Sequence, residues 1–130
     1  MPTLFTRIVR GEIPCHKVWE DDRHLAFLDI SPIQPGHTLV IPKREVPYLF
    51  DLSAYEQSAL WEAVRRVEGA VRRATASPRV CMMVVGWEVP HVHVHLVPTH
   101  HGSEFSVPPK MKQTEAELSA TAAAIRAATR

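Results

Sequence analysis

Three histidines stand two residues apart in the run PHVHVHLV, which occupies residues 90–97 of the 130-residue chain. Side chains on a β-strand alternate between its two faces, so this pattern predicts a strand over 89–98. His91, His93 and His95 would share one face, roughly 6.5 Å apart in succession. The branched residues between them would face the core. A neutral imidazole nitrogen can act as nucleophile, base, hydrogen-bond donor or metal ligand near neutral pH. The histidine face is therefore predicted to be a chemical site.

The residue types of this strand allow two kinds of chemistry. His-x-His on a strand is a common way to place two imidazoles on zinc. Alternatively, one imidazole can attack phosphorus while another donates to the phosphate oxygens, where negative charge develops. No carboxylate or thiol is obviously paired with the strand, which ranks the metal interpretation last. The formal net charge of +1 gives no strong overall field for nucleic acid or an anionic membrane. A small anionic substrate would therefore be held by local groups.

The elements that must position the histidines indicate an α+β fold. The strands come in runs and do not alternate regularly with helices, which is typical of an antiparallel sheet. We expect about five strands, a main helix and a C-terminal helix. The predicted strands cover residues 17–20, 25–30, 38–41, 80–85 and 89–98.

Capping boxes, in which Ser or Thr is followed three residues later by Glu, mark the start of both helices. Ser53 with Glu56 opens the main helix, and Ser77 followed by Pro78 ends it. Apolar residues recur at helical spacing between these limits and predict its core face. Thr114 and Glu117 open the C-terminal helix.

The length fits one domain over residues 1–130, with a core over about 3–98 and a C-terminal loop and helix over 99–130. Cys15 and Cys81 form no C-x-x-C pair, and we interpret them as reduced thiols of a reducing compartment. The N-terminal residues lack the apolar stretch of a signal peptide, and no run reaches the ~20 apolar residues of a membrane span. We expect a cytoplasmic protein without membrane or nucleic-acid partners.

The histidine run resembles the signature of the histidine-triad (HIT) family, in which three histidines alternate with apolar residues, at all seven positions. The similarity extends over residues 3–98. It includes IVRGEIP at 8–14, LAFLDISP at 25–32 and PGHTLVIPK at 35–43. The resemblance implies a HIT-like fold whose sheet is joined across a homodimer. It also implies a hydrolase that attacks the α-phosphorus of a purine nucleotide derivative and needs no cofactor.

The resemblance also implies roles for individual residues. The middle histidine of the family is the nucleophile, which is His93 here. His95 matches the donor to the phosphate oxygens, and His91 the histidine that supports the site. Asp29 matches the acid that binds the ribose hydroxyls. The matching base slot consists of Phe5, Ile8, Phe27, Leu28 and Ile30, and the loop before the triad supplies Gly86, Glu88 and Val89 to the nucleotide site.

Two departures from the family pattern affect the expected function. Many bacterial members bind zinc through a C-x-x-C, a later histidine and the first triad histidine. Thr3, Thr6 and Glu45 occupy the first three of these positions, so we predict no such zinc site. Trp87 stands where a glutamine often assists the leaving group, which favours a phosphoramidate or similar substrate over a dinucleoside polyphosphate. Glu88 could protonate an amine leaving group.

The changed loop over residues 80–88 also leaves a second function open. The chain could be a nucleotide-binding or regulatory module that keeps the fold with little turnover. A hydrolase predicts a nucleotidyl adduct on His93, whereas a binding module predicts bound nucleotide without product.

Overall fold

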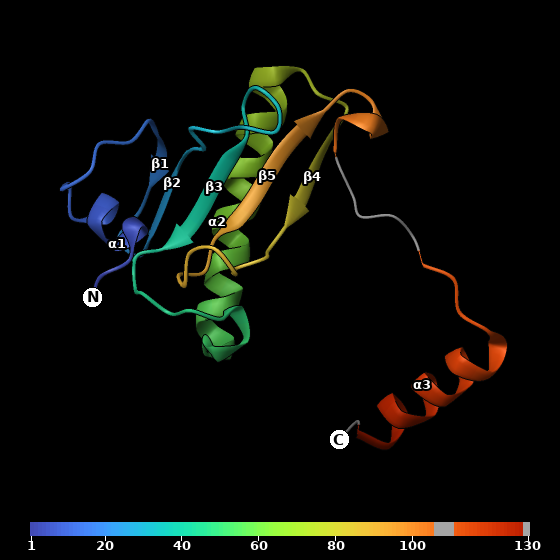
Figure 1. The fold of residues 1–130 in the computed structure, drawn as a ribbon. Helices are drawn as coiled ribbons and strands as arrows, with labels where there is room; N and C mark the ends of the chain where they lie inside the picture. Colours follow the sequence, from blue (N-terminus) through green and yellow to red (C-terminus); the bar gives the residue numbers. More distant parts are fainter. Residues whose placement is uncertain (106–110, 129–130) are drawn as a thin grey trace.

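A computed structural model describes residues 1–105 and 111–128 of the chain. Its centre is one antiparallel sheet in the order β1-β2-β3-β5-β4 (Figure 1). This arrangement confirms the predicted α+β class and five-stranded sheet. The strands are β1 (Lys17–Glu20), β2 (His24–Leu28), β3 (Thr38–Pro42), β4 (Arg79–Met83) and β5 (Val94–Thr99).

Helices cover the two faces of the sheet unequally. The 22-residue α2 (Ala54–Thr75) packs along one face, whereas the short α1 (Leu4–Val9) lies beside the β1–β2 end of the other (Figure 1). The single-turn helices η1 (Leu49–Asp51) and η2 (Gly102–Glu104) sit in connections. The second face is therefore left partly open for a site.

The predicted capping box of α2 is present. The Ser53 side chain accepts from the Glu56 N–H, and the Glu56 carboxylate accepts from the Ser53 N–H. Ala76 adopts the left-handed conformation and ends the helix before Pro78. One stripe of the helix is buried, consisting of Leu60, Ala63, Val64, Val67, Gly69 and Val71. The stripe fixes α2 on the sheet.

The sheet separates two apolar clusters. On the α2 side, Ala26 and Val40 pack with Val92, Val94 and Leu96 and with the buried stripe of α2. On the other side, Phe5 of α1 packs against alternate residues of β2 and β3, which are Leu25, Phe27, Leu39 and Ile41. The period of two along each strand thus sends one set of side chains to the core and the other toward the open face.

The predicted strand over 89–98 is wrong at its start, because β5 begins only at Val94. The preceding backbone bends instead of joining the ladder. The Val92 N–H donates to the Val46 carbonyl at 2.9 Å, and the His93 ring donates to the His91 carbonyl at 2.7 Å. His91 and His93 therefore lie in a bent segment before β5, and only His95 belongs to the strand.

Two other strands also end earlier than predicted. β2 stops at Leu28 because the next residue, Asp29, accepts the Ser31 N–H with its own carboxylate and turns the chain. β4 stops at Met83, and residues 84–86 continue without a ladder.

The C-terminal helix α3 (Glu115–Ala128) exists, as its capping box predicts, but none of its described residues is buried. Figure 1 shows it standing away from the sheet at the far end of the C-terminal segment. Across residues 1–105 and 111–128, no helix is long and apolar enough to cross a membrane.

Candidate active site

A cavity of about 360 Å³ opens on the face of the sheet opposite α2. Most of the residues that the sequence singled out line it. These are Phe5, Ile8, Phe27, Leu28, Asp29, Ile30, Glu88, Val89, His93 and His95. His91 and Gly86 do not line it. The cavity thus joins α1, the end of β2, the loop before the triad and the start of β5.

One end of the cavity is apolar. Phe5 contacts the edge of Phe27, with ring centroids 5.6 Å apart, and lies 4.9 Å from the His93 ring. Leu28 and Ile30 remain 37% and 87% exposed although both are large and apolar. An apolar slot next to an imidazole suits a flat heteroaromatic ligand whose polar part reaches the histidines.

The His93 ring is held in one tautomer by backbone geometry. Its Nδ1 lies 2.7 Å from the His91 carbonyl oxygen, which can only accept. The proton of a neutral His93 ring is therefore on Nδ1, and Nε2 keeps its lone pair. The residue is 6% exposed and lines the cavity. An unprotonated imidazole nitrogen at a cavity wall can serve as a nucleophile.

His91 lies buried behind the cavity wall and supports the segment that carries His93. It is fully buried, and its Nε2 donates to the Pro42 carbonyl at 2.7 Å. Its Nδ1 must then accept, and the Thr3 hydroxyl lies 3.0 Å away. Burial lowers the pKa of His91, which favours the neutral ring. The ring connects α1 to the segment that carries His93.

Thr3, Thr6 and Glu45, whose positions the sequence comparison above related to zinc ligands, form a hydrogen-bonded cluster with His91. The Glu45 carboxylate accepts from the Thr3 N–H at 2.7 Å and from the Thr6 hydroxyl at 2.6 Å. These bonds hold the pKa of Glu45 at about 2. The Thr3 hydroxyl lies between the Thr6 hydroxyl and His91. Two hydroxyls and one carboxylate thus fasten α1 to His91 at positions where a structural zinc site would have thiolates and an imidazole.

His95 faces two groups of the β2–β3 connection. Its Nδ1 lies 3.0 Å from Nε2 of His37, and Nε2 of His37 lies 3.7 Å from the Asp29 carboxylate. Burial, above all, lowers the pKa of His95 to about 4 and also lowers that of His37. Both rings are neutral at pH 7.

In the described part of the chain, Asp29, His37 and His95 form a group of potential metal ligands, with one ligand atom of each within 4.8 Å of the others. The backbone N–H of Ile33 donates to Nδ1 of His37 at 3.0 Å. A metal on Nε2 of a neutral His37 would require a proton on Nδ1, facing that N–H. The local hydrogen bonding therefore opposes a metal here.

Sequence reasoning did not assign His37 to the site. Its signal is the strand period, because His37, Leu39 and Ile41 alternate on one face, and Leu39 lies opposite His95 in the ladder. That register pairs residues far apart in the chain, and no local sequence pattern predicts it. His37 does not itself line the cavity, but six residues that do were also missed, namely Leu4, Ile13, Pro14, Cys15, Ser31 and Leu39.

The loop before the triad is divided between two surfaces. Glu88 and Val89 line the cavity, whereas Gly86 lies beside Pro47 and Val92 in a smaller hollow. Gly86 has a φ of +80°, which a residue with a Cβ rarely adopts, so its role is to turn the loop. Trp87 is 92% exposed next to Glu88.

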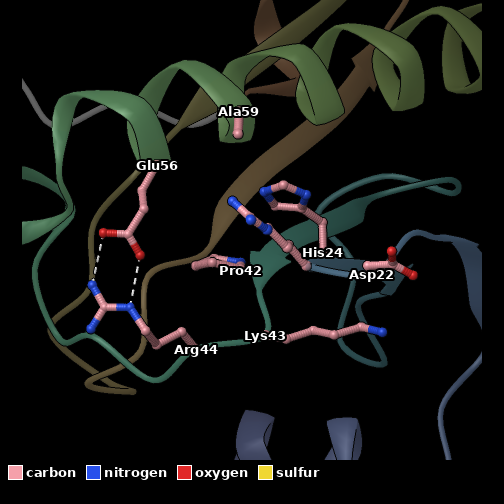
Figure 2. Close-up of a pocket in the computed structure, with 8 residues that line it drawn as sticks. Asp22, His24, Pro42, Lys43, Arg44, Glu56 and Ala59 are labelled. Carbon is pink, nitrogen blue, oxygen red and sulfur yellow. Dashed lines mark hydrogen bonds and ion pairs between the residues drawn. The ribbon is translucent and has the colours of Figure 1, made fainter.

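A second cavity, of about 350 Å³, lies on the α2 side, between the start of β2, the end of β3 and the start of α2 (Figure 2). Figure 2 shows Arg44 facing Glu56, and two hydrogen bonds of 2.7 and 2.8 Å join them. Lys43 is paired with Glu20 at 2.7 Å. These cations already have carboxylate partners, so the cavity offers less chemistry than the histidine site.

Comparisons with known proteins agree with this geometry. The family model described as the HIT domain matches residues 10–102. The adenylylsulfatase HINT3 of Arabidopsis thaliana is 35% identical over 100 residues, which are 73% of this chain and 51% of that protein. The asymmetrical bis(5'-nucleosyl)-tetraphosphatase of Schizosaccharomyces pombe is 40% identical over 78 residues, which are 56% of this chain and 43% of that protein. The chain therefore spans about half the length of these two relatives.

A solved structure of a HIT-family protein from Bacillus subtilis has the same fold. It superposes with a TM-score of 0.86 at 27% identity, over 100% of this chain and 99% of that one. The similarity thus extends beyond the sheet to the C-terminal segment.

Proposed function

Because this chain belongs to the HIT family, we propose that it hydrolyses a purine nucleotide derivative through a nucleotidyl intermediate on His93. The family includes nucleotide hydrolases, such as the two relatives described above. In this chain's own cavity, His93 would be the nucleophile, His95 the donor to the phosphate, and the apolar slot with Asp29 would bind the nucleoside.

The observation that carries the proposal is the hydrogen bond from Nδ1 of His93 to the His91 carbonyl. In the neutral ring this bond places the proton on Nδ1 and leaves the lone pair on Nε2. His95 lies beside it, with ring centroids 4.9 Å apart. A nucleophile and a donor thus stand next to an apolar slot and a carboxylate, which is what a nucleoside 5'-phosphate derivative needs.

The proposed reaction has two displacements at phosphorus. His93 Nε2 attacks the α-phosphorus, and the bond to the leaving group breaks with its electron pair. An amine or phosphate leaving group takes a proton from the medium or from Glu88, which lines the cavity. Water then attacks the same phosphorus, releases the nucleoside monophosphate and regenerates neutral His93. His95 donates to the phosphate oxygens in both steps, where charge develops.

The binding groups support a purine nucleoside. Phe5 and Phe27 offer an apolar slot for the base, with Leu28 and Ile30 at its rim. Asp29 is 21% exposed at the cavity wall and has a carboxylate oxygen that can accept from vicinal ribose hydroxyls. Trp87 in place of a glutamine favours substrates with leaving groups that need little assistance. We therefore expect adenosine 5'-phosphoramidate to be turned over faster than a dinucleoside tetraphosphate.

The test follows AMP release from adenosine 5'-phosphoramidate together with the intact mass of the protein. Wild type should release AMP, and His93→Ala should release none. His100→Ala is the matched control, because this histidine is exposed and follows the far end of β5. AMP release by His93→Ala at the wild-type rate would overturn the assignment of the nucleophile. Nucleotide binding without AMP or adduct in wild type would overturn the hydrolase and support a binding module.

We also propose a homodimer through β4. This edge strand has a partner on one side among the described strands, and exposes Met82 at 52%, with Val85 at 55% and Trp87 at 92% in the loop that follows. Unpaired backbone groups next to apolar side chains favour addition of another strand. A second copy would supply one.

A further inference from the structure

We propose that His37 is a positioning residue that fixes neutral His95 in the tautomer with its proton on Nε2. The inference rests on the proposed function, because it explains how His95 can donate to a phosphate oxygen. His37 lies in the connection between β2 and β3, outside the histidine run. The two rings meet because β3 and β5 are adjacent in the sheet, with Leu39 opposite His95.

A backbone N–H fixes which nitrogen of His37 carries the proton. The backbone N–H of Ile33 can only donate, and it lies 3.0 Å from Nδ1 of His37. Nδ1 must accept, so the single proton of a neutral His37 ring is on Nε2. That nitrogen lies 3.0 Å from Nδ1 of His95. Nδ1 of His95 therefore accepts, and its proton is on Nε2.

The surroundings hold His37 in this orientation. The residue is 2% exposed, so water does not compete for its ring. A carboxylate oxygen of Asp29 lies 3.7 Å from Nε2, beyond hydrogen-bonding distance. The His37 N–H donates to the Gln34 carbonyl, and its carbonyl accepts from the Asp29 N–H at 2.9 Å. The backbone and the ring of His37 are therefore both held by residues of the β2–β3 connection.

The consequence is a pair of neighbouring rings with opposite tautomers. His93 keeps a lone pair on Nε2, because its Nδ1–H donates to a carbonyl. His95 keeps a proton on Nε2, because its Nδ1 accepts from His37. The nucleophile and the donor therefore need no proton transfer between them before the reaction. Without His37, Nδ1 of His95 would lack the donor that it has here, and the proton could move there.

The experiment measures the tautomer directly in the unliganded protein. Imidazole nitrogen NMR at neutral pH should show His95 with a protonated Nε2 and a nitrogen–nitrogen coupling across the hydrogen bond to His37. His37→Phe removes the donor at similar size and should give a tautomer mixture. His37→Gln can place an amide N–H near the same point and should restore the single tautomer. If the variants do not fold, the tautomer of His95 measured in the wild-type protein still tests the proposal.

Activity provides the second measurement. On adenosine 5'-phosphoramidate, His37→Phe should lower kcat at least tenfold with little change in KM, and His37→Gln should recover most of that loss. A wild-type His95 protonated on Nδ1, or a His37→Phe protein that keeps the single Nε2 tautomer, would overturn the proposal. If wild type shows the expected tautomer and coupling but releases no AMP, the tautomer assignment stands and the hydrolase proposal fails.

Discussion

At the scale of single residues, the site depends on which nitrogen of each ring carries the proton. His91 donates from Nε2 to Pro42 and accepts at Nδ1 from Thr3, while His93 donates from Nδ1 to the His91 carbonyl. Each assignment follows from a backbone carbonyl, whose role cannot change. The rigid backbone, more than any charge, thus prepares the histidines for different tasks.

Asp29 gives a prediction for nucleotide affinity. One carboxylate oxygen already accepts the Ser31 N–H at 2.8 Å, and an asparagine could keep that bond. Asp29→Asn should therefore preserve the turn and weaken AMP binding roughly tenfold, since hydrogen bonds to a charged acceptor contribute about 1.5–3 kcal/mol. Calorimetric titration measures the affinity. With 2',3'-dideoxy-AMP, wild type and variant should bind alike; a persistent difference would show that Asp29 does not contact the ribose.

The sequence predicted which residues belong to the site better than it predicted the contacts between them. Alternation and the family resemblance named His93, His95, Asp29 and the apolar slot, and the cavity brings them together. His37 was not predicted, because its partner lies 58 positions away and their contact depends on the register of β3 with β5. Local patterns indicate which residue types can react, whereas the tautomers require the fold.

At the scale of elements, hydrogen bonds through Thr3, Thr6 and Glu45 join α1 to the segment around His91. The hydroxyls of Thr3 and Thr6 and Nδ1 of His91 lie 3.0–3.4 Å from one another, close to the ligand spacing around a tetrahedral zinc ion. Glu45 is bonded to the same threonines. The backbone therefore holds positions 3, 6 and 91 at a spacing that would suit zinc ligands, although positions 3 and 6 carry hydroxyls instead of thiolates.

This geometry predicts that three substitutions would create a zinc site. In the variant Thr3→Cys, Thr6→Cys, Glu45→His, the new thiolates and imidazole should join Nδ1 of His91 and bind one zinc per chain. Metal analysis after dialysis measures the stoichiometry, and chelation should lower the thermal midpoint. The matched control adds His91→Asn and should lose the site. Zinc retained by that control, or none in the triple variant, would contradict the geometry.

The loop between β2 and β3 depends on Gly36. Its φ is +94°, and a Cβ there would lie 2.8 Å from Thr75 and 3.1 Å from Pro98. Gly36→Ala should lower the free energy of unfolding by about 2–4 kcal/mol through backbone strain and crowding. Gly11→Ala is the control, because its φ is +78° with nothing within 4 Å, and should cost about 1 kcal/mol. Equal decreases in the free energy of unfolding for the two variants, measured by urea unfolding, would show that crowding of the new Cβ at position 36 does not contribute.

The strand boundaries show where periodicity stops being informative. Alternation correctly placed Val92, Val94 and Leu96 in the core, but only His93 and His95 of the three histidines line the cavity, and β5 begins only at Val94. The spacing of residues along a chain predicts which face of a strand each side chain occupies. Whether the backbone joins a β-ladder depends also on a neighbouring strand to which it can hydrogen-bond. Residues 91–93 bond to the segment near Val46 and to each other, which no local pattern indicates.

At the scale of the whole molecule, buried histidines make stability depend on pH. Burial lowers the pKa values of His37, His91 and His95, the last to about 4. An unfolded histidine takes up a proton near pH 6.5. The unfolded chain therefore binds more protons between about pH 6.5 and 4, and the free energy of unfolding falls as pH falls through this range.

Urea unfolding at a series of pH values measures this dependence. The expected loss is at most about 1.4 kcal/mol per pH unit for each histidine involved. Added salt should leave most of the slope, because desolvation, not exposed charge, is its main cause. A stability that stays flat from pH 7 to 4 would contradict the buried neutral histidines.

The two edges of the sheet differ in a way that predicts the assembly. β1 is four residues long, its register is irregular, and it carries Lys17 and Glu20, which are features that discourage strand addition. β4 pairs in an unbroken register with β5 and exposes Met82 at 52%. A second copy should therefore join at β4 and extend the sheet, as an exposed apolar edge favours.

Light scattering should then give twice the chain mass of 14.6 kDa. Met82→Lys places a charge on the β4 edge and should shift the protein to monomer at low micromolar concentration. Val18→Lys makes the same kind of change at an exposed position of β1 and should leave the dimer intact. Deleting residues 106–130 should also leave it intact if β4 carries the interface, since none of the described residues of α3 is buried in the single chain. Dissociation by Val18→Lys but not by Met82→Lys would place the contact at the opposite edge.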